Sequence, residues 1–134
     1  MSQDDVEIVT ASIDAWNAGE FDALQEFYAS DAVVVPDTSV FPEAGRMHGR
    51  EEWRRWAEEI RTPWANPRWD IGEVVVVEDG RVLVRGAWAG HGVASGIEVS
   101  SSITGIYTIR DGVILHVEYF FDHDKALKAV GLAE

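Results

Sequence analysis

The chain contains no cysteine among its 134 residues. Without a thiol, the sequence excludes disulfides, zinc–thiolate sites and thiol nucleophiles. It also lacks any apolar stretch that approaches the ~20 residues of a membrane span. The first residues, MSQDDVEIV, are acidic and show neither the basic start nor the apolar run of a secretory signal peptide. We therefore expect a soluble, cytoplasmic protein.

Basic residues are scarce. Lysine and arginine together number 11 against 24 acidic residues, which gives a formal net charge of −13. Such a surface repels phosphate backbones and anionic lipid. We therefore expect neither nucleic-acid binding nor membrane attachment, and we interpret the charge as a solubility feature.

Aromatic residues are the abundant component, with six tryptophans, five phenylalanines and three tyrosines. Large rings fill cores and interfaces, and they also line apolar ligand pockets. The length suits one domain, and no repeat, low-complexity segment or linker interrupts it. We therefore treat residues 1–134 as a single domain.

The first 35 residues predict two helices and a short strand. An apolar stripe at helical spacing marks the first helix, formed by Val6, Val9, Ile13 and Trp16. Gly19 is placed to end this helix as a left-handed C-terminal cap. A second, shorter stripe follows, formed by Leu24, Phe27 and Tyr28. The β-branched run at 33–35 predicts a strand that Pro36 ends.

Residues 36–48 hold two prolines and a glycine without any period, and we interpret them as a loop. A loop of this length in a small domain is uncommon and often functional. A third helix is expected to begin near Gly49, with an apolar stripe of Trp53, Trp56 and Ile60. Residues 62–67 break it.

The remainder reads as an antiparallel meander with strands at 69–78, 81–91, 97–109 and 113–121. Asp79-Gly80 and Asp111-Gly112 are tight-turn signals, and 92–96 is a turn. A short helix is expected at 123–130. Helices followed by a meander favour the α+β class, with the N-terminal helices packed on a curved, mostly antiparallel sheet.

Three segments carry a family resemblance: WNAGEFDALQEFYASDAVVV from Trp16, GREEW from Gly49, and IYTIRDGVILHVEYFFDHDKALKAVGL from Ile106. In this order they resemble the SnoaL-like family, within the nuclear-transport-factor-like and ketosteroid-isomerase-like superfamily. The resemblance implies a cone-shaped α+β barrel whose sheet curls around a blind apolar pocket that the helices close. It also implies a homodimer formed through the outer face of the sheet.

Strand alternation then sorts the side chains. Facing the pocket or core we expect Leu115, Val117, Tyr119 and Phe121 on the fourth strand, Val99, Ser101, Ile103, Gly105 and Tyr107 on the third, and Trp88 on the second. A single β-bulge would invert any of these assignments.

Asp37 is the candidate general base. A ketosteroid isomerase resembling this chain places its catalytic aspartate at about this position. Desolvation beside apolar rings raises the pKa of a carboxyl group, which helps it accept a carbon-bound proton. The alternative is a turn aspartate that caps Thr38 or Ser39 through its side chain. From the sequence, this alternative is the better supported of the two.

The remaining catalytic patterns of the superfamily are missing. The two oxyanion donors of the isomerase align with Ser12 and near Gly105, so that specific activity is rejected. Limonene-type epoxide hydrolases use an Asp-Arg-Asp arrangement. Its fourth-strand acid aligns with Tyr119, and its second-strand Arg and Asp fall near Gly86 and Trp88, so this chain has none of the three residues. Tyr119 and Tyr107 remain as hydroxyls that could donate to a ligand oxygen, or as ordinary core tyrosines.

His91 is a further catalytic candidate, because histidine is the usual proton shuttle near neutral pH. The alternation that places Trp88 inside places His91 outside, so a solvated strand-end histidine is the competing interpretation. His116, Glu118 and Asp122 share a strand face but span too far to converge on one metal ion. We expect neither a metal nor a cofactor.

The predicted ligand-binding residues are Trp16, Tyr28, Phe41, Trp53, Trp56, Trp88, Ile103, Val117 and Phe121, and Trp64 and Trp69 could pave the same pocket. Two hypotheses follow. In the first, the protein is a cofactor-independent isomerase, cyclase or dehydratase that acts on a small apolar molecule, with Asp37 as base and Tyr119 or Tyr107 as donor. In the second, it is a non-catalytic module for hydrophobic-ligand binding or dimerisation. An inward carboxylate or histidine distinguishes the first from the second.

Overall fold

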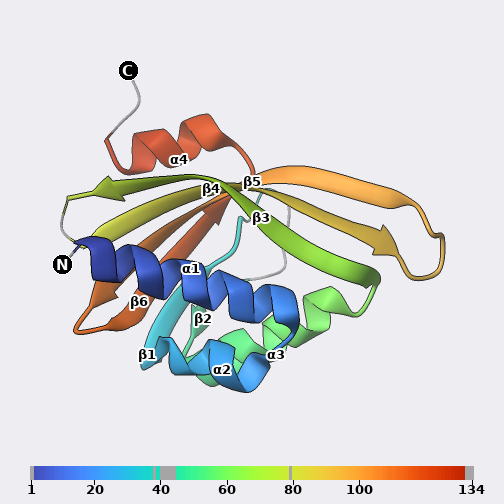
Figure 1. Cartoon of the computed structure of the whole chain (residues 1–134), viewed down its shortest axis with the longest axis horizontal. Helices are drawn as coiled ribbons and strands as arrows, with labels where there is room; N and C mark the ends of the chain where they lie inside the picture. The colour runs from blue at the N-terminus through green and yellow to red at the C-terminus, as the bar shows by residue number, and fades with distance from the viewer. Residues whose placement is uncertain (1, 38, 40–44, 79, 132–134) are drawn as a thin grey trace.

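The fold combines four helices with one six-stranded sheet (Figure 1). The computed structural model describes residues 2–37, 39, 45–78 and 80–131. The helices are α1 (Ser2–Ala18), α2 (Phe21–Glu26), α3 (Arg50–Arg61) and α4 (His123–Ala129). The strands are β1 (Tyr28–Val35), β2 (Met47–His48), β3 (Trp64–Val77), β4 (Arg81–Gly92), β5 (Glu98–Arg110) and β6 (Val113–Phe120).

The strands run in the order β2-β1-β6-β5-β4-β3. Only the β1–β6 pair is parallel among these strands, and the other four pairs are antiparallel. The long meander from β3 to β6 is the predicted one. The α+β class and the cone-shaped architecture, with N-terminal helices on a curved and mostly antiparallel sheet, are confirmed.

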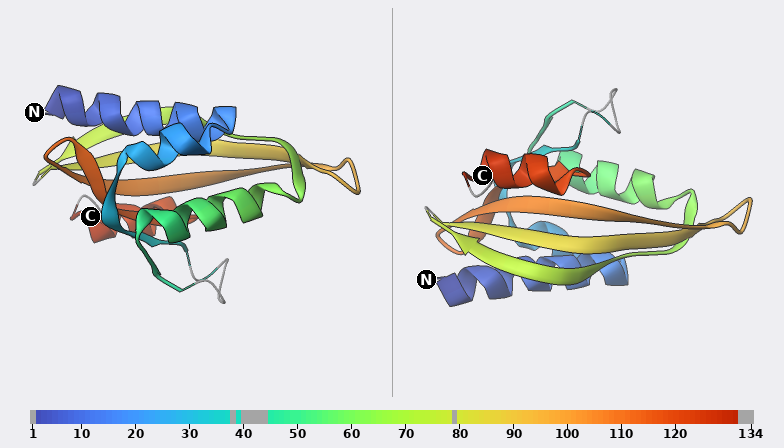
Figure 2. Two further views of the ribbon diagram at one scale, coloured as in Figure 1. Left: turned by 90° about the horizontal axis from the view of Figure 1, so that it is seen from below. Right: turned by 90° about the horizontal axis from the view of Figure 1, so that it is seen from above.

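The two faces of the sheet are covered differently. Helix α4 lies on one side of the curved sheet, and α1 lies along the other (Figures 1 and 2). The larger core sits on the side of α1 and includes Val9, Ile13, Val82, Val84 and Tyr107. We call this side the concave face and the side of α4 the convex face.

Helix α1 forms as its stripe predicts. Val9 and Ile13 are buried, and the helix ends where Gly19 adopts a φ of +72°. In that conformation Gly19 N donates to the Trp16 carbonyl and Glu20 N to the Ala15 carbonyl, which satisfies carbonyls that the helix leaves open. This turn directs the chain into α2 and fixes Trp16 at the edge of the concave face.

Tyr28 corrects a sequence-based prediction, because it opens β1 and does not continue the second helix. Its backbone pairs with Ile114 of β6, and Ile114 N donates to the Phe27 carbonyl over 2.9 Å. Sheet pairing here overrides a helical spacing of only three apolar residues. The side chain of Tyr28 is thereby buried in the concave core.

Two further strand boundaries differ from the prediction. The segment 36–48 ends in the short strand β2, which pairs with Val33 and Val34. Strand β3 begins at Trp64 and not at Trp69, because it crosses the predicted break through an irregularity at which Asn66 adopts a φ of 51°. Both pairings join segments that have no local sequence signal for a strand.

A β-bulge changes the alternation on β6. The β5–β6 register shifts between Thr108 and Ile109, so Ile114 and Val117 both enter the concave core. The predicted inward position of Leu115 is therefore wrong, since it is the residue that the bulge displaces. Beyond the bulge the predicted phase returns, and Val117 and Tyr119 share the concave face.

Candidate functional site

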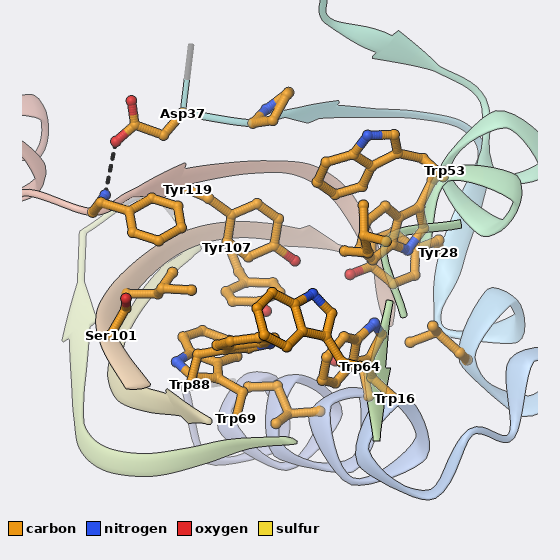
Figure 3. A pocket seen from close by; sticks show the side chains of 18 of the residues that line it. Trp16, Tyr28, Asp37, Trp53, Trp64, Trp69, Trp88, Ser101, Tyr107 and Tyr119 are labelled. Atoms are coloured by element: carbon orange, nitrogen blue, oxygen red, sulfur yellow. Dashed lines mark hydrogen bonds between the residues drawn. The ribbon is translucent and has the colours of Figure 1, made fainter. Parts of the chain in front are cut away.

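A cavity of about 500 Å³ lies between the concave face and helices α1, α2 and α3 (Figure 3). The lining residues are Ser12, Ile13, Trp16, Leu24, Tyr28, Pro36, Asp37, Trp53, Trp56, Ile60, Pro63, Trp64, Trp69, Trp88, Val99, Ser101, Ile103, Tyr107, Tyr119 and Phe121. Apart from Asp37, none of them carries a charge. Most of the wall is aromatic or aliphatic.

All six tryptophans and all three tyrosines of the chain line this one cavity. They come from α1, α3 and five of the strands, so only the tertiary structure brings them together. Neighbouring rings contact one another at angles typical of aromatic packing: Trp64 and Trp88 meet edge to face at 4.9 Å, and Trp69 and Tyr119 at 6.1 Å. The aromatic content of the composition is thus concentrated in a pocket wall.

Two glycines allow the Trp69 side chain to lie close to the neighbouring strands β4 and β5. A Cβ atom on Gly86 would lie 2.6 Å from the Trp69 indole nitrogen, and one on Gly105 would lie 3.2 Å from the far end of that indole. Asn17 holds the backbone of Trp69, accepting from its N–H at 2.8 Å and donating to its carbonyl at 3.0 Å. This arrangement sets how deep the cavity extends toward the strands.

Three tyrosines form a cluster at the wall of the cavity. Burial raises the pKa of Tyr28, Tyr107 and Tyr119, and the neighbouring Tyr119 raises the pKa of the other two further. Hydrogen bonding from Tyr107 and Tyr28 acts in the opposite direction on Tyr119, lowering its pKa against the effect of burial. At neutral pH all three hydroxyls are protonated and available as donors.

Asp37 reaches the cavity at the end of β1, but its carboxylate is engaged with backbone. Oδ2 accepts from Phe121 N at 2.8 Å, and Oδ1 accepts from Ser39 N at 2.9 Å. Burial acts to raise the pKa of Asp37, but the hydrogen bonds from Phe121 and Ser39 prevail, so the pKa lies below its ordinary value. The expected rise in pKa is therefore wrong, and the predicted capping of Ser39 is observed (Figure 3).

The structure does not bring His91 to the cavity. It lies on the convex side of β4, exposed, with Nε2 3.8 Å from a Glu98 carboxylate oxygen. The unbroken register from Trp88 to His91 against β5 accounts for this, because residues three apart on a regular strand face opposite ways. Trp88 accordingly lines the cavity, and His91 does not.

The other predicted ligand-binding residues divide into three groups. Those that line the cavity are Trp16, Tyr28, Trp53, Trp56, Trp88, Ile103 and Phe121. Val117 is fully buried in the core and is not part of the lining. Phe41 lies outside the described residues.

Sequence reasoning missed two contributors to the site. Asn17 was hidden because its contacts to Trp69 span 52 positions along the chain. Gly86 had a usable signal, since a glycine inside a long apolar strand often marks the close approach of another group.

Across the described ranges, no group of three or more His, Asp or Glu side chains is placed to hold a metal ion. No described helix has the length and hydropathy to cross a membrane.

Comparison with known proteins identifies the family. The SnoaL-like domain model matches residues 9–117, which is most of the chain. The chain belongs to the SnoaL-like domain family. A search of curated proteins found no match for this SnoaL-like protein.

Solved structures share its fold. A Catenulispora acidiphila protein with a ketosteroid isomerase-like fold, in complex with trimethylamine, is 22% identical with a TM-score of 0.75, covering 94% of this chain and 93% of that one. A candidate polyketide cyclase from Xanthomonas campestris is 20% identical with a TM-score of 0.79, covering 96% and 98%. TerC, co-crystallised with polyporic acid, is 19% identical with a TM-score of 0.77, covering 95% and 97%. The family and fold are compatible with small-molecule binding or with chemistry of the cyclase and isomerase type.

Proposed function

We propose that this SnoaL-like protein binds a flat, apolar small molecule in its aromatic cavity. One observation carries the proposal: every tryptophan and tyrosine of the chain lines a single space of about 500 Å³. Protein interiors are otherwise close-packed, and side chains that face a void lose dispersion contacts. A bound molecule would restore those contacts.

The chemistry of the wall favours a planar apolar ligand. Aromatic rings offer stacking and edge contacts to another ring system, and a few polar groups then set its orientation. The ligands named for two similar structures, trimethylamine and polyporic acid, are both small molecules. These similarities support small molecules as ligands, and the aromatic wall makes ring compounds the first class to test.

The test is tryptophan fluorescence quenching by a panel of terpenoids, steroids and aromatic polyketides. Ser101 lines the cavity, whereas its neighbour Ser102 is exposed on the convex side of the same strand. Ser101→Phe should weaken binding because the added ring occupies the cavity, and Ser102→Phe should leave the affinity unchanged. Equal effects of the two substitutions, or a panel without saturable quenching, would contradict the proposal.

A second candidate function is cofactor-independent proton transfer, and it is favoured by the presence of a carboxylate, Asp37, in the lining. Against it, the lowered pKa makes Asp37 a weaker base than the desolvated carboxylate expected from the sequence. A suitable probe is 5-nitrobenzisoxazole, a flat molecule whose ring opens when a base removes its C–H proton. The proton passes to the carboxylate, the N–O bond breaks, and a cyanophenolate forms.

Ring opening by the wild type that is lost in Asp37→Asn, with binding retained, would support catalysis. Equal rates in the two proteins would remove Asp37 as the base. The same pair of measurements tests whether Tyr119 or Tyr107 assists, since replacing either by phenylalanine removes only a hydroxyl.

The homodimer expected from the family resemblance is a further part of the proposal. The convex surface of β4 and β5 presents exposed small side chains at Ala87, Ser100 and Ser102, which suit close approach of a second sheet. Light scattering on the purified protein should give a dimer mass, and Ala87→Arg should shift it toward the monomer. A monomer at all accessible concentrations would contradict this part alone.

A further inference from the structure

Two neighbouring positions on the concave face of β4 and β5 carry no side chain. Gly86 pairs with Ile103, and Val84 pairs with Gly105, so the two glycines lie diagonally across the same strand pair. Ile103 lines the cavity and Val84 is buried in the core, which places both glycines on the concave face. We call the space over Gly86 and Gly105 the glycine notch, because only backbone forms its base.

The indole of Trp69 occupies the glycine notch. Trp69 belongs to β3, and its side chain reaches over β4 to β5. A Cβ atom at position 86 would lie 2.6 Å from the indole nitrogen and 3.0 Å from Cδ1, and one at position 105 would lie 3.2 Å from Cη2. The two ends of one ring system thus lie against two different strands, and a side chain at either position would displace the ring.

Packing positions this ring, and no hydrogen bond of the ring does so within the described part of the chain. The buried indole N–H of Trp69 has no hydrogen-bond partner there. Asn17 binds only the backbone of Trp69, at its N–H and its carbonyl. Tyr119 contacts the ring at 6.1 Å with an interplanar angle of 74°. The location of the indole therefore depends on the shape of the notch beneath it.

The location of the Trp69 ring in turn limits the space for a ligand. Trp69 lines the cavity, and only 7% of its surface is exposed. A cavity of about 500 Å³ lies in the range that takes drug-sized molecules. A single-ring ligand would leave much of this space empty and forgo dispersion contacts with the wall. A larger fused-ring ligand needs the depth that the recessed indole provides.

We infer that Trp69 is the residue that determines ligand size, and that its seat in the glycine notch fits the cavity to planar ligands of three or four fused rings. Gly86 and Gly105 are positioning residues, since they act on the ligand through the Trp69 ring and are not part of the lining. This inference rests on the proposed binding function and adds the size class of the ligand and the residue that sets it.

The test uses three planar probes with one hydroxyl each: 2-naphthol with two fused rings, 9-phenanthrol with three and 1-hydroxypyrene with four. Equilibrium dialysis against the full chain, read by the fluorescence of the probes, gives their affinities. In the wild type the affinity should rise about threefold to tenfold for each added ring. Any apolar cavity favours larger probes, so the decisive quantity is how variants change the ratio of the 1-hydroxypyrene and 2-naphthol affinities.

Substitutions on the two sides of the contact should change this ratio in opposite directions. Gly105→Ala should lower it about tenfold, because the displaced ring takes space from the larger probe. Its affinity for 2-naphthol should stay within about twofold, which also reports that the variant is folded. Trp69→Phe should raise the ratio about threefold, because the smaller ring leaves part of the notch open.

The double variant tests whether the glycine acts through the indole. In the Trp69→Phe background, Gly105→Ala should change the ratio by less than about twofold, since its methyl group then has room. The control is Gly45→Ala, because nothing lies within 4 Å of a Cβ there, and the ratio should equal that of the wild type.

The outcomes separate the size filter from the function on which it rests. An unchanged ratio in Gly105→Ala, an equal loss in both backgrounds, or tightest wild-type binding of 2-naphthol would overturn the inference while the binding function stands. Failure of all three probes to bind the wild type would contradict both. Should Gly105→Ala fail to fold, Trp69→Phe decides the question, since a ratio that does not rise would overturn the role of Trp69.

Discussion

The concave and convex faces of the same sheet use side chains in opposite ways. On the concave face, large rings contact one another only in part and leave about 500 Å³ open. On the convex face, Leu83 and Ile106 are covered by Ala126 and Val130 from α4 and its end, and together these four form a small closed cluster. The large aromatic residues of the concave face therefore surround a cavity, whereas the aliphatic residues of the convex face pack against one another and against α4.

Polar contacts also stabilise α4 on the convex face. The Asp122 carboxylate accepts from the backbone N–H groups of Asp124 and Lys125 and so caps α4. His123 Nδ1 lies 2.8 Å from the Thr104 hydroxyl, which joins the helix to β5. On the concave face, by contrast, the buried indole N–H groups of Trp53 and Trp69 have no hydrogen-bond partner in the described part of the chain. Unsatisfied donors thus lie on the face that carries the proposed function.

The largest effect on stability should come from Leu83→Ala on the convex face. Leu83 is fully buried, and truncating such a leucine costs about 3 kcal/mol of unfolding free energy. Affinity for cavity ligands should not change. Denaturant titration and ligand dialysis on the same samples measure the two quantities.

The matched concave substitution is Ile103→Ala. Because Ile103 already faces the cavity, its truncation should cost about 1 kcal/mol or less while weakening ligand binding. Equal stability losses for the two variants would break the distinction between a packed and an open face.

Gly105→Ala should destabilise the protein less than Leu83→Ala does. The new Cβ would lie 3.0 Å from Tyr107 Cε1, 3.2 Å from Trp69 and 3.3 Å from Tyr119, so the rings would have to move. Overpacking of this kind costs about 1–2 kcal/mol, and the displaced rings should lower ligand affinity. Thermal unfolding and dialysis measure both effects. The control is Gly45→Ala, since nothing lies within 4 Å of a Cβ there and no change is expected.

Removing the α4 cap should cost about 1 kcal/mol. In Asp122→Ala the backbone N–H groups of Asp124 and Lys125 lose their acceptor, whereas Asp122→Asn keeps one. Denaturant midpoints should therefore fall for alanine and largely recover for asparagine, and ligand affinity should be unchanged in both. A loss of affinity in Asp122→Ala would show that the two faces are coupled.

The smallest effect concerns Asp37 and depends on pH. Its pKa is lower in the folded protein than the ordinary value of 3.8, so its charge stabilises the fold above that value. This contribution is lost as the pH falls through the folded pKa. Asp37→Asn should reduce stability by about 0.5 kcal/mol at pH 7 because an amide is a poorer acceptor. The difference from wild type should vanish in acid, and a constant difference would contradict the hydrogen-bond account.

Much of the fold was predictable because its signals are local. The stripe of α1, the left-handed Gly19, the aromatic stripe of α3 and the inward phase of β5 each depend on residues a few positions apart. The start of β1 at Tyr28 and the bulge on β6 were not predictable, since both depend on the pairing between β1 and β6 or β5 and β6. The candidate site divides in the same way: the tryptophans could be proposed as a wall, but the support of Trp69 by Asn17 and Gly86 could not.

By itself, the sequence determined the class of fold, most of the helices and strands, the absence of cysteine chemistry and the number of aromatic rings available to line an apolar cavity. These follow from composition and from periods of two or 3.6 residues. Only the tertiary structure decided that all nine tryptophans and tyrosines line one cavity, and that the Asp37 carboxylate accepts hydrogen bonds from Phe121 and Ser39. The reason is physical: which polar group is satisfied depends on partners far away in the chain, and local patterns carry no record of them.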